Sequence, residues 1–184
     1  MLYPIGVQSF AEVIERENVY VDKTHLMHKL ISEGKYYFLS RPRRFGKSLL
    51  ISTMEAYFSG RKELFKGLAI DGVETDWKEY PVLHFDLNAK KFDTLKDLYD
   101  LIGRQLERYE EKYETEAVDK SLDGRFYNLI MAIAETTANQ VVILVDEYDK
   151  PLLQTIGNVD LQNVYREALK AFYGVIKSCD SQIR

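Results

Sequence analysis

The chain has 184 residues, 46% of them hydrophobic, which is enough to bury one sizeable core and suits a single domain. Its 25 lysine and arginine residues face 29 aspartate and glutamate residues, which excludes a global basic field that would make nucleic acid an obligatory partner. A lone cysteine, Cys179, excludes an intrachain disulfide, and no apolar run approaches the roughly 20 residues of a membrane span. We therefore expect a cytoplasmic protein with no membrane partner.

The beginning of the chain predicts a helical leading segment. Apolar side chains recur at helical spacing over residues 10–16 and 23–31, and residues 19–21 between them are a short β-prone run. Gly34 is expected to end the second helix, because glycine commonly follows the last helical residue.

The middle of the chain predicts two strands, each followed by a helix. Residues 36–39 are a compact apolar run that leads through an arginine- and proline-rich loop to a helix over residues 48–58. Residues 81–87 predict a second strand, and residues 94–113 predict a long amphipathic helix. The charged face of this helix, which includes Glu110, is expected to be solvated.

The last third of the chain continues the alternation. A helix is expected over residues 126–138, followed by a continuous apolar run at 141–145 of the kind found in strands covered on both faces. Residues 161–177 predict another helix, and a further strand could begin at residues 182–184. This order predicts an α/β fold with a doubly wound parallel sheet and helices on both of its faces.

The segment Arg41–Ser48, with the sequence RPRRFGKS, has the context of a phosphate-binding loop. Such a loop needs backbone N–H groups at the start of a helix, a lysine that spans two phosphates, and a hydroxyl for a metal ion. Gly46, Lys47 and Ser48 supply the end of this pattern after an apolar run and before a helix. Arg41 stands where the full pattern has its first glycine, so the motif is incomplete, and the alternative is a solvated basic turn.

The basic residues of this loop have two possible roles. Arg43 and Arg44 either add phosphate contacts through their planar donor groups or lie in solvent. Arg41 receives no role beyond loop structure. The predicted nucleotide-binding residues are Arg43, Arg44, Phe45, Gly46, Lys47, Ser48 and Leu49.

A second motif ends the apolar run at 141–145, where Asp146 and Glu147 follow directly. Nucleoside-triphosphatases hold their metal ion and orient the attacking water at the end of such a strand. We expect Asp146 and Ser48 to bind Mg²⁺, and Glu147 and Lys47 to be the catalytic residues. Asp149 is either a further carboxylate near the metal or, as we favour, an acidic residue of the following turn.

Three segments together resemble the AAA-ATPase-like proteins of gut and anaerobic bacteria: FAEVIERENVYVDKT, RPRRFGKSLL and VVILVDEYDKPL. The resemblance covers essentially the whole chain. It implies an additional-strand P-loop NTPase domain that binds ATP and Mg²⁺, with residues 1–34 leading into a nucleotide-binding core over 35–184. In that family the RPRRFGKS spelling is typical, and the segment around Asp22 lies near the base and ribose, although helix capping is the simpler role for Asp22.

The resemblance also implies segments beyond those present. Similar proteins continue with a sensor strand, further helices and a C-terminal restriction-endonuclease-like nuclease domain, so we expect this chain to be the truncated N-terminal part. A nucleic-acid partner follows only from that resemblance, and oligomers are compatible with it. Three functions remain open: an ATPase that switches an attached domain or assembly, a non-hydrolysing nucleotide-binding interaction module, and a small-molecule kinase.

Overall fold

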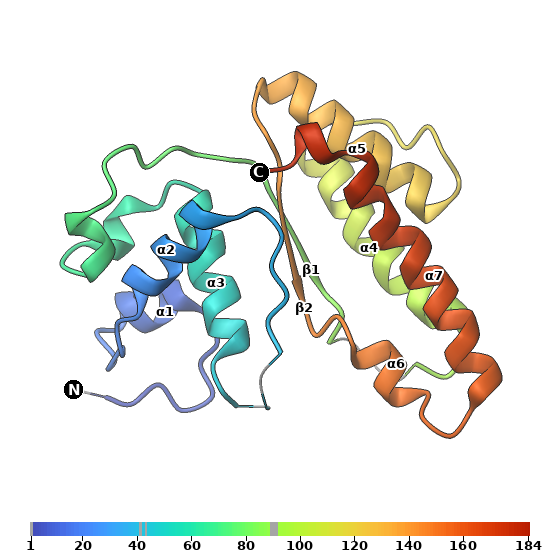
Figure 1. The fold of residues 1–184 in the computed structure, drawn as a ribbon, viewed down its shortest axis with the longest axis horizontal. Coiled ribbons are helices and arrows are strands. Elements are labelled where there is room, and N and C mark those ends of the chain that lie inside the picture. Colours follow the sequence, from blue (N-terminus) through green and yellow to red (C-terminus); the bar gives the residue numbers. More distant parts are fainter. Residues whose placement is uncertain (1, 41, 43, 89–91) are drawn as a thin grey trace. The chain divides into compact units, whose positions relative to one another are not determined.

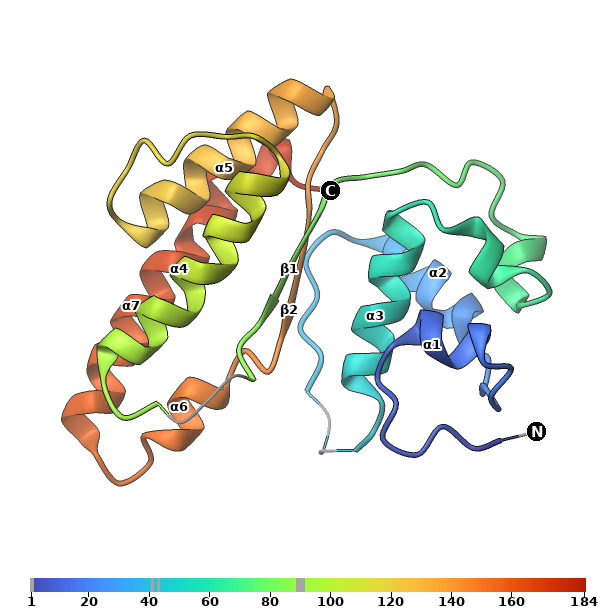
Figure 2. The same cartoon turned by 180° about the vertical axis from the view of Figure 1, so that it is seen from behind.

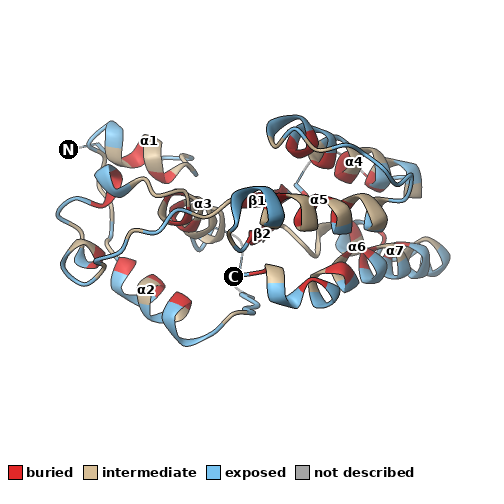
Figure 3. Ribbon diagram, turned by 90° about the horizontal axis from the view of Figure 1, so that it is seen from above, coloured by how far each residue is buried: buried red, intermediate tan, exposed pale blue. Residues whose placement is uncertain are grey.

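The computed structural model describes residues 2–40, 42, 44–88 and 92–184. The chain divides into two compact units, Met1–Val82 and Leu83–Arg184, and each unit buries its own set of apolar side chains (Figure 3). Within these described ranges, no helix combines the length and the apolar character that a membrane crossing requires.

The first unit is helical. Its core is aromatic, because the fully buried ring of Phe10 lies 4.8 Å from the ring of Phe65 and 5.2 Å from that of Tyr20. The side chain of Ser9 caps the first helix by accepting a hydrogen bond from the N–H of Glu12. The elements are α1 (Phe10–Glu15), α2 (Thr24–Glu33), α3 (Lys47–Phe58), η1 (Lys62–Phe65) and η2 (Ala69–Gly72).

The second unit is a small α/β layer structure. Two adjacent parallel strands form the sheet, and three long helices lie together over one of its faces (Figures 1 and 2). The first strand starts at Val82, at the boundary between the units. The elements are β1 (Val82–Asp86), α4 (Leu95–Lys112), α5 (Leu122–Thr137), β2 (Val142–Asp146), α6 (Lys150–Gln154), α7 (Val159–Ser178) and η3 (Asp180–Gln182).

Three aromatic rings join the sheet to its helices. Phe126 of α5 stacks on Phe172 of α7 with ring centroids 4.5 Å apart, and Phe85 of β1 meets both rings edge-on. All three side chains are nearly inaccessible to water. Burying such large apolar side chains contributes about 1.5–3 kcal/mol each, so this trio is the centre of the second unit.

The outer edge of β1 is closed by side chains of α4. The N–H of His84 donates to the Oη of Tyr109 at 2.7 Å, and that hydroxyl donates to the carbonyl of His84 at 2.8 Å. One helical turn earlier, Gln105 bonds both the N–H and the carbonyl of Asp86. An open strand edge invites pairing with another chain, and these side chains satisfy the groups that would pair.

The structure confirms the predicted long helices and two of the predicted strands, with changes at their ends. The helix expected from residue 126 begins at Leu122, because Ser121 caps it by accepting from the N–H of Gly124. Near the expected strand at 182–184, Val141 and Ile183 form an isolated parallel bridge. The hydrogen bonds of Val141 run to Gln182 and Arg184, on the opposite edge of the sheet from β1.

Two predicted β segments do not form strands. Residues 19–21 are irregular, and 36–39 are not part of the sheet, which contains β1 and β2 among the described residues. The apolar side chains of 36–39 are 38–72% exposed. The prediction was wrong because β-propensity describes how a side chain fits a covered sheet surface, and a four-residue run does not provide that surface itself.

The charged face of α4 is not uniformly solvated, which corrects the expectation for Glu110. Its carboxylate is 8% exposed and forms a bidentate pair with Arg125 of α5, with Oε1 2.9 Å from Nε and Oε2 2.5 Å from Nη2. The hydrogen bonds that Arg125 donates to Glu110 are the main cause that raises the pKa of Arg125. The helical period shows which face is polar but not which charged residue a second helix covers.

We predict that Glu110→Ala destabilises the chain by about 1.5–3 kcal/mol, because it removes the charge-assisted hydrogen bonds of the half-buried guanidinium of Arg125. Urea unfolding followed by circular dichroism measures the loss. The matched control is Glu111→Ala, since Glu111 is exposed, and it should change stability by no more than about 0.5 kcal/mol. Equal effects of the two substitutions would show that the ion pair is not a stabilising feature.

Candidate functional site

The predicted phosphate-binding loop reverses into α3 through two left-handed residues. Gly46 is the N-cap of α3 with φ of +75°, and Arg44 has φ of +66°. Among the described residues no side chain caps this helix, so the N–H groups of its first turn, at Lys47 and Ser48, have no side-chain acceptor there. N–H groups at the start of a helix, together with its dipole, attract anions.

The body of α3 is anchored, which fixes the direction of its first turn. The Oγ of Ser52 accepts a hydrogen bond from the N–H of Phe10 at 2.9 Å, joining α3 to α1. The side chains of Thr53 and Met54 are buried behind it. Lys47, Ser48 and Leu49 are half-buried, and Phe45 is exposed. Arg41 and the predicted ligand Arg43 lie outside the described residues.

The end of β2 holds the first predicted carboxylate. Asp146 is buried, and its Oδ1 accepts a hydrogen bond from the N–H of Glu147 at 2.9 Å. Its carbonyl accepts from the N–H of Leu87 at 3.1 Å, which continues the pairing of the two strands. The strand pairing therefore holds the backbone of Asp146, and one carboxylate oxygen is engaged by the turn that follows.

Glu147 has a left-handed backbone, with φ of +51°. For a residue other than glycine this conformation costs about 1–2 kcal/mol, and such residues concentrate at functional sites. The turn is held by the N–H of Lys150, which donates to the carbonyl of Glu147 at 3.0 Å. The side chain of Glu147 is only half-buried.

Sequence patterns did not identify a clamp between the two strand ends. The Nζ of Lys150 donates to the carbonyl of Asn88 at 2.8 Å and also contacts its side-chain oxygen. The N–H of Asn88 in turn donates to Asp86 Oδ1 at 2.7 Å. The sequence held one indication of this contact, which is the position of the two residues. Asn88 and Lys150 each follow a strand, and side chains at the carboxyl ends of parallel strands converge.

Asp149 occupies the N-cap position of α6, but its side chain makes no capping hydrogen bond. Nearby on α7, burial raises the pKa of Tyr173, and the charge of Asp149 adds to the effect. The Tyr173 hydroxyl is buried without a hydrogen-bond partner among the described residues. This places Asp149 in the turn before α6, as favoured from the sequence.

Asp22 is used for local structure. Its Oδ1 accepts from the N–H and the hydroxyl of Thr24 at the start of α2, at 2.8 and 2.7 Å. Its Oδ2 accepts from the N–H of Ala69 at 2.6 Å, which joins α2 to η2. Burial opposes ionisation of Asp22, but these hydrogen bonds outweigh it and lower the pKa. The carboxylate therefore accepts from the first N–H of α2, although the N-cap position itself is held by Lys23 and has no side-chain cap.

The donor chemistry at Asp146 fits Mg²⁺, a hard cation that prefers oxygen ligands and binds through one or two carboxylates plus phosphates and water. The hydrogen bond from Glu147 occupies one of the two Asp146 oxygens. Among the described residues, no three histidine, cysteine, aspartate or glutamate side chains are grouped as a protein-only metal site. Ser48, the second predicted metal ligand, belongs to the first unit.

The residues of the predicted site thus come from both units. Gly46, Lys47 and Ser48 are together at the start of α3 in the first unit. Asp146 and Glu147 are together at the end of β2 in the second unit, beside the strand-end clamp. The members of each group are adjacent in sequence, and each group lies at one end of a single element.

Comparison with known proteins identifies a family whose model matches the chain. The family model described as "Predicted AAA-ATPase" matches residues 4–184. A protein of Azotobacter chroococcum mcd 1, described as "Uncharacterized protein in vnfD 5'region", is 37% identical over 183 residues. The match covers 98% of this chain and 35% of that protein, so the chain spans about a third of this relative's length. No solved structure matches the chain.

We predict that Glu147→Gly is more stable than Glu147→Ala by about 1 kcal/mol, because glycine adopts a left-handed backbone without steric cost. The matched pair is Glu167→Gly and Glu167→Ala in the middle of α7, where glycine should instead be less stable by about 1 kcal/mol. Chemical denaturation of the four variants gives both differences. The same sign at both positions would contradict strain at Glu147.

Proposed function

The chain belongs to the predicted AAA-ATPase family, and on that premise we propose that it is an ATP-binding, Mg²⁺-dependent ATPase module that switches an attached domain or assembly. The observation that carries the proposal is the start of α3, where the N-cap Gly46 is left-handed and supplies no side chain to the N–H groups of the first turn, which includes Lys47. This is the backbone arrangement that phosphate binding requires.

The first unit supplies phosphate recognition in this proposal. The N–H groups of the first turn of α3 and the ammonium group of Lys47 bind the β- and γ-phosphates, and Arg44 adds its planar donor group. Lys47 is half-buried, so its interaction with phosphate is stronger than that of a fully solvated lysine. The remaining predicted contacts come from the backbone between Phe45 and Leu49.

The second unit supplies the acidic residues. Asp146 and the hydroxyl of Ser48 would hold Mg²⁺, which when bound neutralises charge on the phosphate oxygens. Glu147 orients the attacking water and accepts its proton. The hydrogen bond from the N–H of Glu147 to Asp146 Oδ1 supports this division, because it holds the buried carboxylate of Asp146 next to the half-buried Glu147.

The strand-end clamp supports the proposed role of Glu147. Lys150 bonds Asn88 with its side chain and Glu147 with its backbone N–H, so the turn is tied to both strands. Positioning is the main contribution of a protein to phosphoryl transfer. A water-orienting carboxylate on a turn held at two points meets that requirement better than one on a free loop.

We predict that Lys47→Ala weakens ATP binding by about tenfold or more, since a charge-assisted phosphate contact contributes about 1.5–3 kcal/mol. Isothermal titration calorimetry with ATP and with GTP, each with and without Mg²⁺, measures the change and the base preference. Lys29→Ala is the matched control, because Lys29 is an exposed lysine of the same unit. Unchanged affinity in Lys47→Ala would refute the phosphate-binding role of the loop.

We predict that Glu147→Gln retains ATP affinity within about threefold and lowers phosphate release by about a hundredfold or more, as expected when a general base is removed. Glu135→Gln, an exposed position on α5, is the control. If the wild-type chain binds ATP but releases no phosphate, the hydrolytic part of the proposal fails and a nucleotide-binding interaction module remains. A phosphorylated acceptor among the products would instead indicate a kinase.

A further inference from the structure

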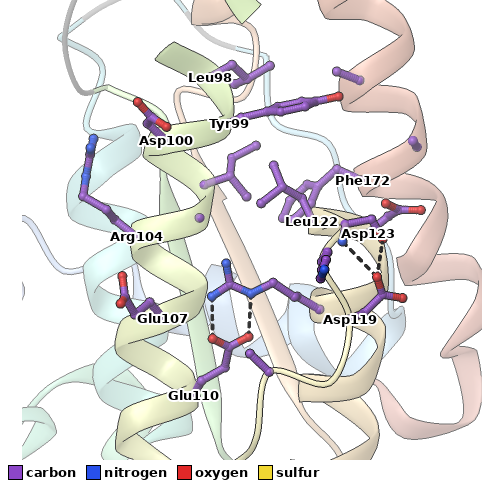
Figure 4. Close-up of a pocket in the computed structure, with 18 of the residues that line it drawn as sticks. Leu98, Tyr99, Asp100, Arg104, Glu107, Glu110, Asp119, Leu122, Asp123 and Phe172 are labelled. Atoms are coloured by element: carbon purple, nitrogen blue, oxygen red, sulfur yellow. Dashed lines mark hydrogen bonds and ion pairs between the residues drawn. The ribbon is translucent and has the colours of Figure 1, made fainter. Parts of the chain in front are cut away.

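A groove of about 980 Å³ lies in the second unit, away from the acidic turn after β2. Its walls come from α4, the segment 113–121, the first turn of α5 and one face of α7 (Figure 4). None of its lining residues belongs to the predicted nucleotide site. The volume is at the upper end of the range of small-ligand pockets, which suits several side chains of a polypeptide.

The floor of the groove is apolar. Leu98 and Ile102 of α4, Leu122 of α5, and Ala171 and Phe172 of α7 line it. Leu98, Ile102 and Phe172 are only 0–2% exposed and belong to the buried core beneath the groove, so Leu122 and Ala171 supply the accessible apolar surface of the floor. A surface of this kind favours contact with apolar side chains or with the methylene stems of long ones.

The rim of the groove is acidic. Seven carboxylate side chains and three cationic side chains line it, a net charge of -4 that equals the formal charge of the whole chain. One carboxylate, Glu110, is already neutralised by its bidentate pair with Arg125 (Figure 4). Six carboxylates then face two cations, and among them Glu107 and Glu111 lie one helical turn apart on α4.

The walls are held in place by the fold. The Glu110–Arg125 pair joins α4 to α5 in the wall of the groove. On the other side, Asp119 accepts hydrogen bonds from the N–H and hydroxyl of Ser121, at 2.9 and 3.0 Å. Asp119 approaches Gly124 so closely that a Cβ there would lie 2.1 Å from its Oδ2. These contacts form the groove in advance, which lowers the entropic cost of binding.

We propose that this groove is the docking surface for a basic amphipathic segment of a partner protein. Apolar side chains of that segment cover the floor, and its arginine and lysine residues pair with the carboxylates of the rim. Charge complementarity selects this occupant, because the same rim repels the phosphates of nucleic acids and acidic peptides. The proposal is independent of nucleotide hydrolysis.

A labelled helical peptide of leucine and arginine, with leucine at positions i, i+3, i+4 and i+7, is the probe. Fluorescence anisotropy at about 150 mM salt, where charges more than about 8 Å apart are largely screened, measures its affinity for the full chain. We expect saturable binding of this peptide and none of a version in which glutamate replaces arginine. A version in which serine replaces leucine should bind at least about fivefold more weakly.

The paired substitution Glu107→Gln with Glu111→Gln should weaken binding of the leucine–arginine peptide by about tenfold. Glu135→Gln with Glu167→Gln removes the same charge at exposed positions outside the groove and should leave the affinity unchanged. Ala171→Trp adds bulk to the floor without changing charge and should also weaken binding. Circular dichroism unfolding confirms that each variant folds.

Three outcomes would overturn the proposal. The first is no saturable binding of the leucine–arginine peptide to the wild-type chain. The second is equal loss in the two paired substitutions, which would indicate a general charge effect. The third is equal affinity of the leucine and serine peptides together with full competition by spermine, which would indicate a polyamine site instead.

Discussion

The pairing of β1 with β2 is the constraint on which the second unit depends. Its last hydrogen bond, from the N–H of Leu87 to the carbonyl of Asp146, fixes where the acidic turn begins. Asp146 then bonds the N–H of Glu147, and Lys150 connects the turn to Asn88 beyond β1. A shift of one residue in the register would turn every side chain of the strand to the other face, so the aromatic core and the acidic turn are specified together.

Helix α4 contributes side chains both to the edge of the sheet and to the groove. On one face, Tyr109 and Gln105 close the edge of β1, and on another Glu110 pairs with Arg125 to position α5. On the polar face of the same helix, Glu107 and Glu111 line the groove. One helix therefore carries the contacts that close the sheet edge and also several carboxylates of the rim. A loop with the same charges would lose more conformational entropy on binding.

Sequence patterns predicted elements whose signal is local. The long helices have a 3.6-residue period, and β2 is a continuous apolar run that ends in two acids. The Lys150–Asn88 clamp and the Glu110–Arg125 pair join residues 62 and 15 positions apart, so no single segment encodes them. The strand predicted for residues 36–39 is absent for the same reason, because a strand needs a neighbouring strand that its own sequence does not provide. Of the predicted site, the position of each motif on its element was predictable, whereas the backbone conformation of Glu147 was not.

The loop before α3 contains a non-glycine residue with a left-handed backbone. Gly46 adopts its left-handed conformation without strain, but Arg44, with φ of +66°, adopts one that costs about 1–2 kcal/mol for a residue with a side chain. Glycine or asparagine at that position would relieve the cost, as Gly46 does two residues later. A hydrogen bond from the guanidinium group of Arg44 to a bound anion would offset this backbone strain. That contact is the role that the phosphate-binding hypothesis gives to Arg44.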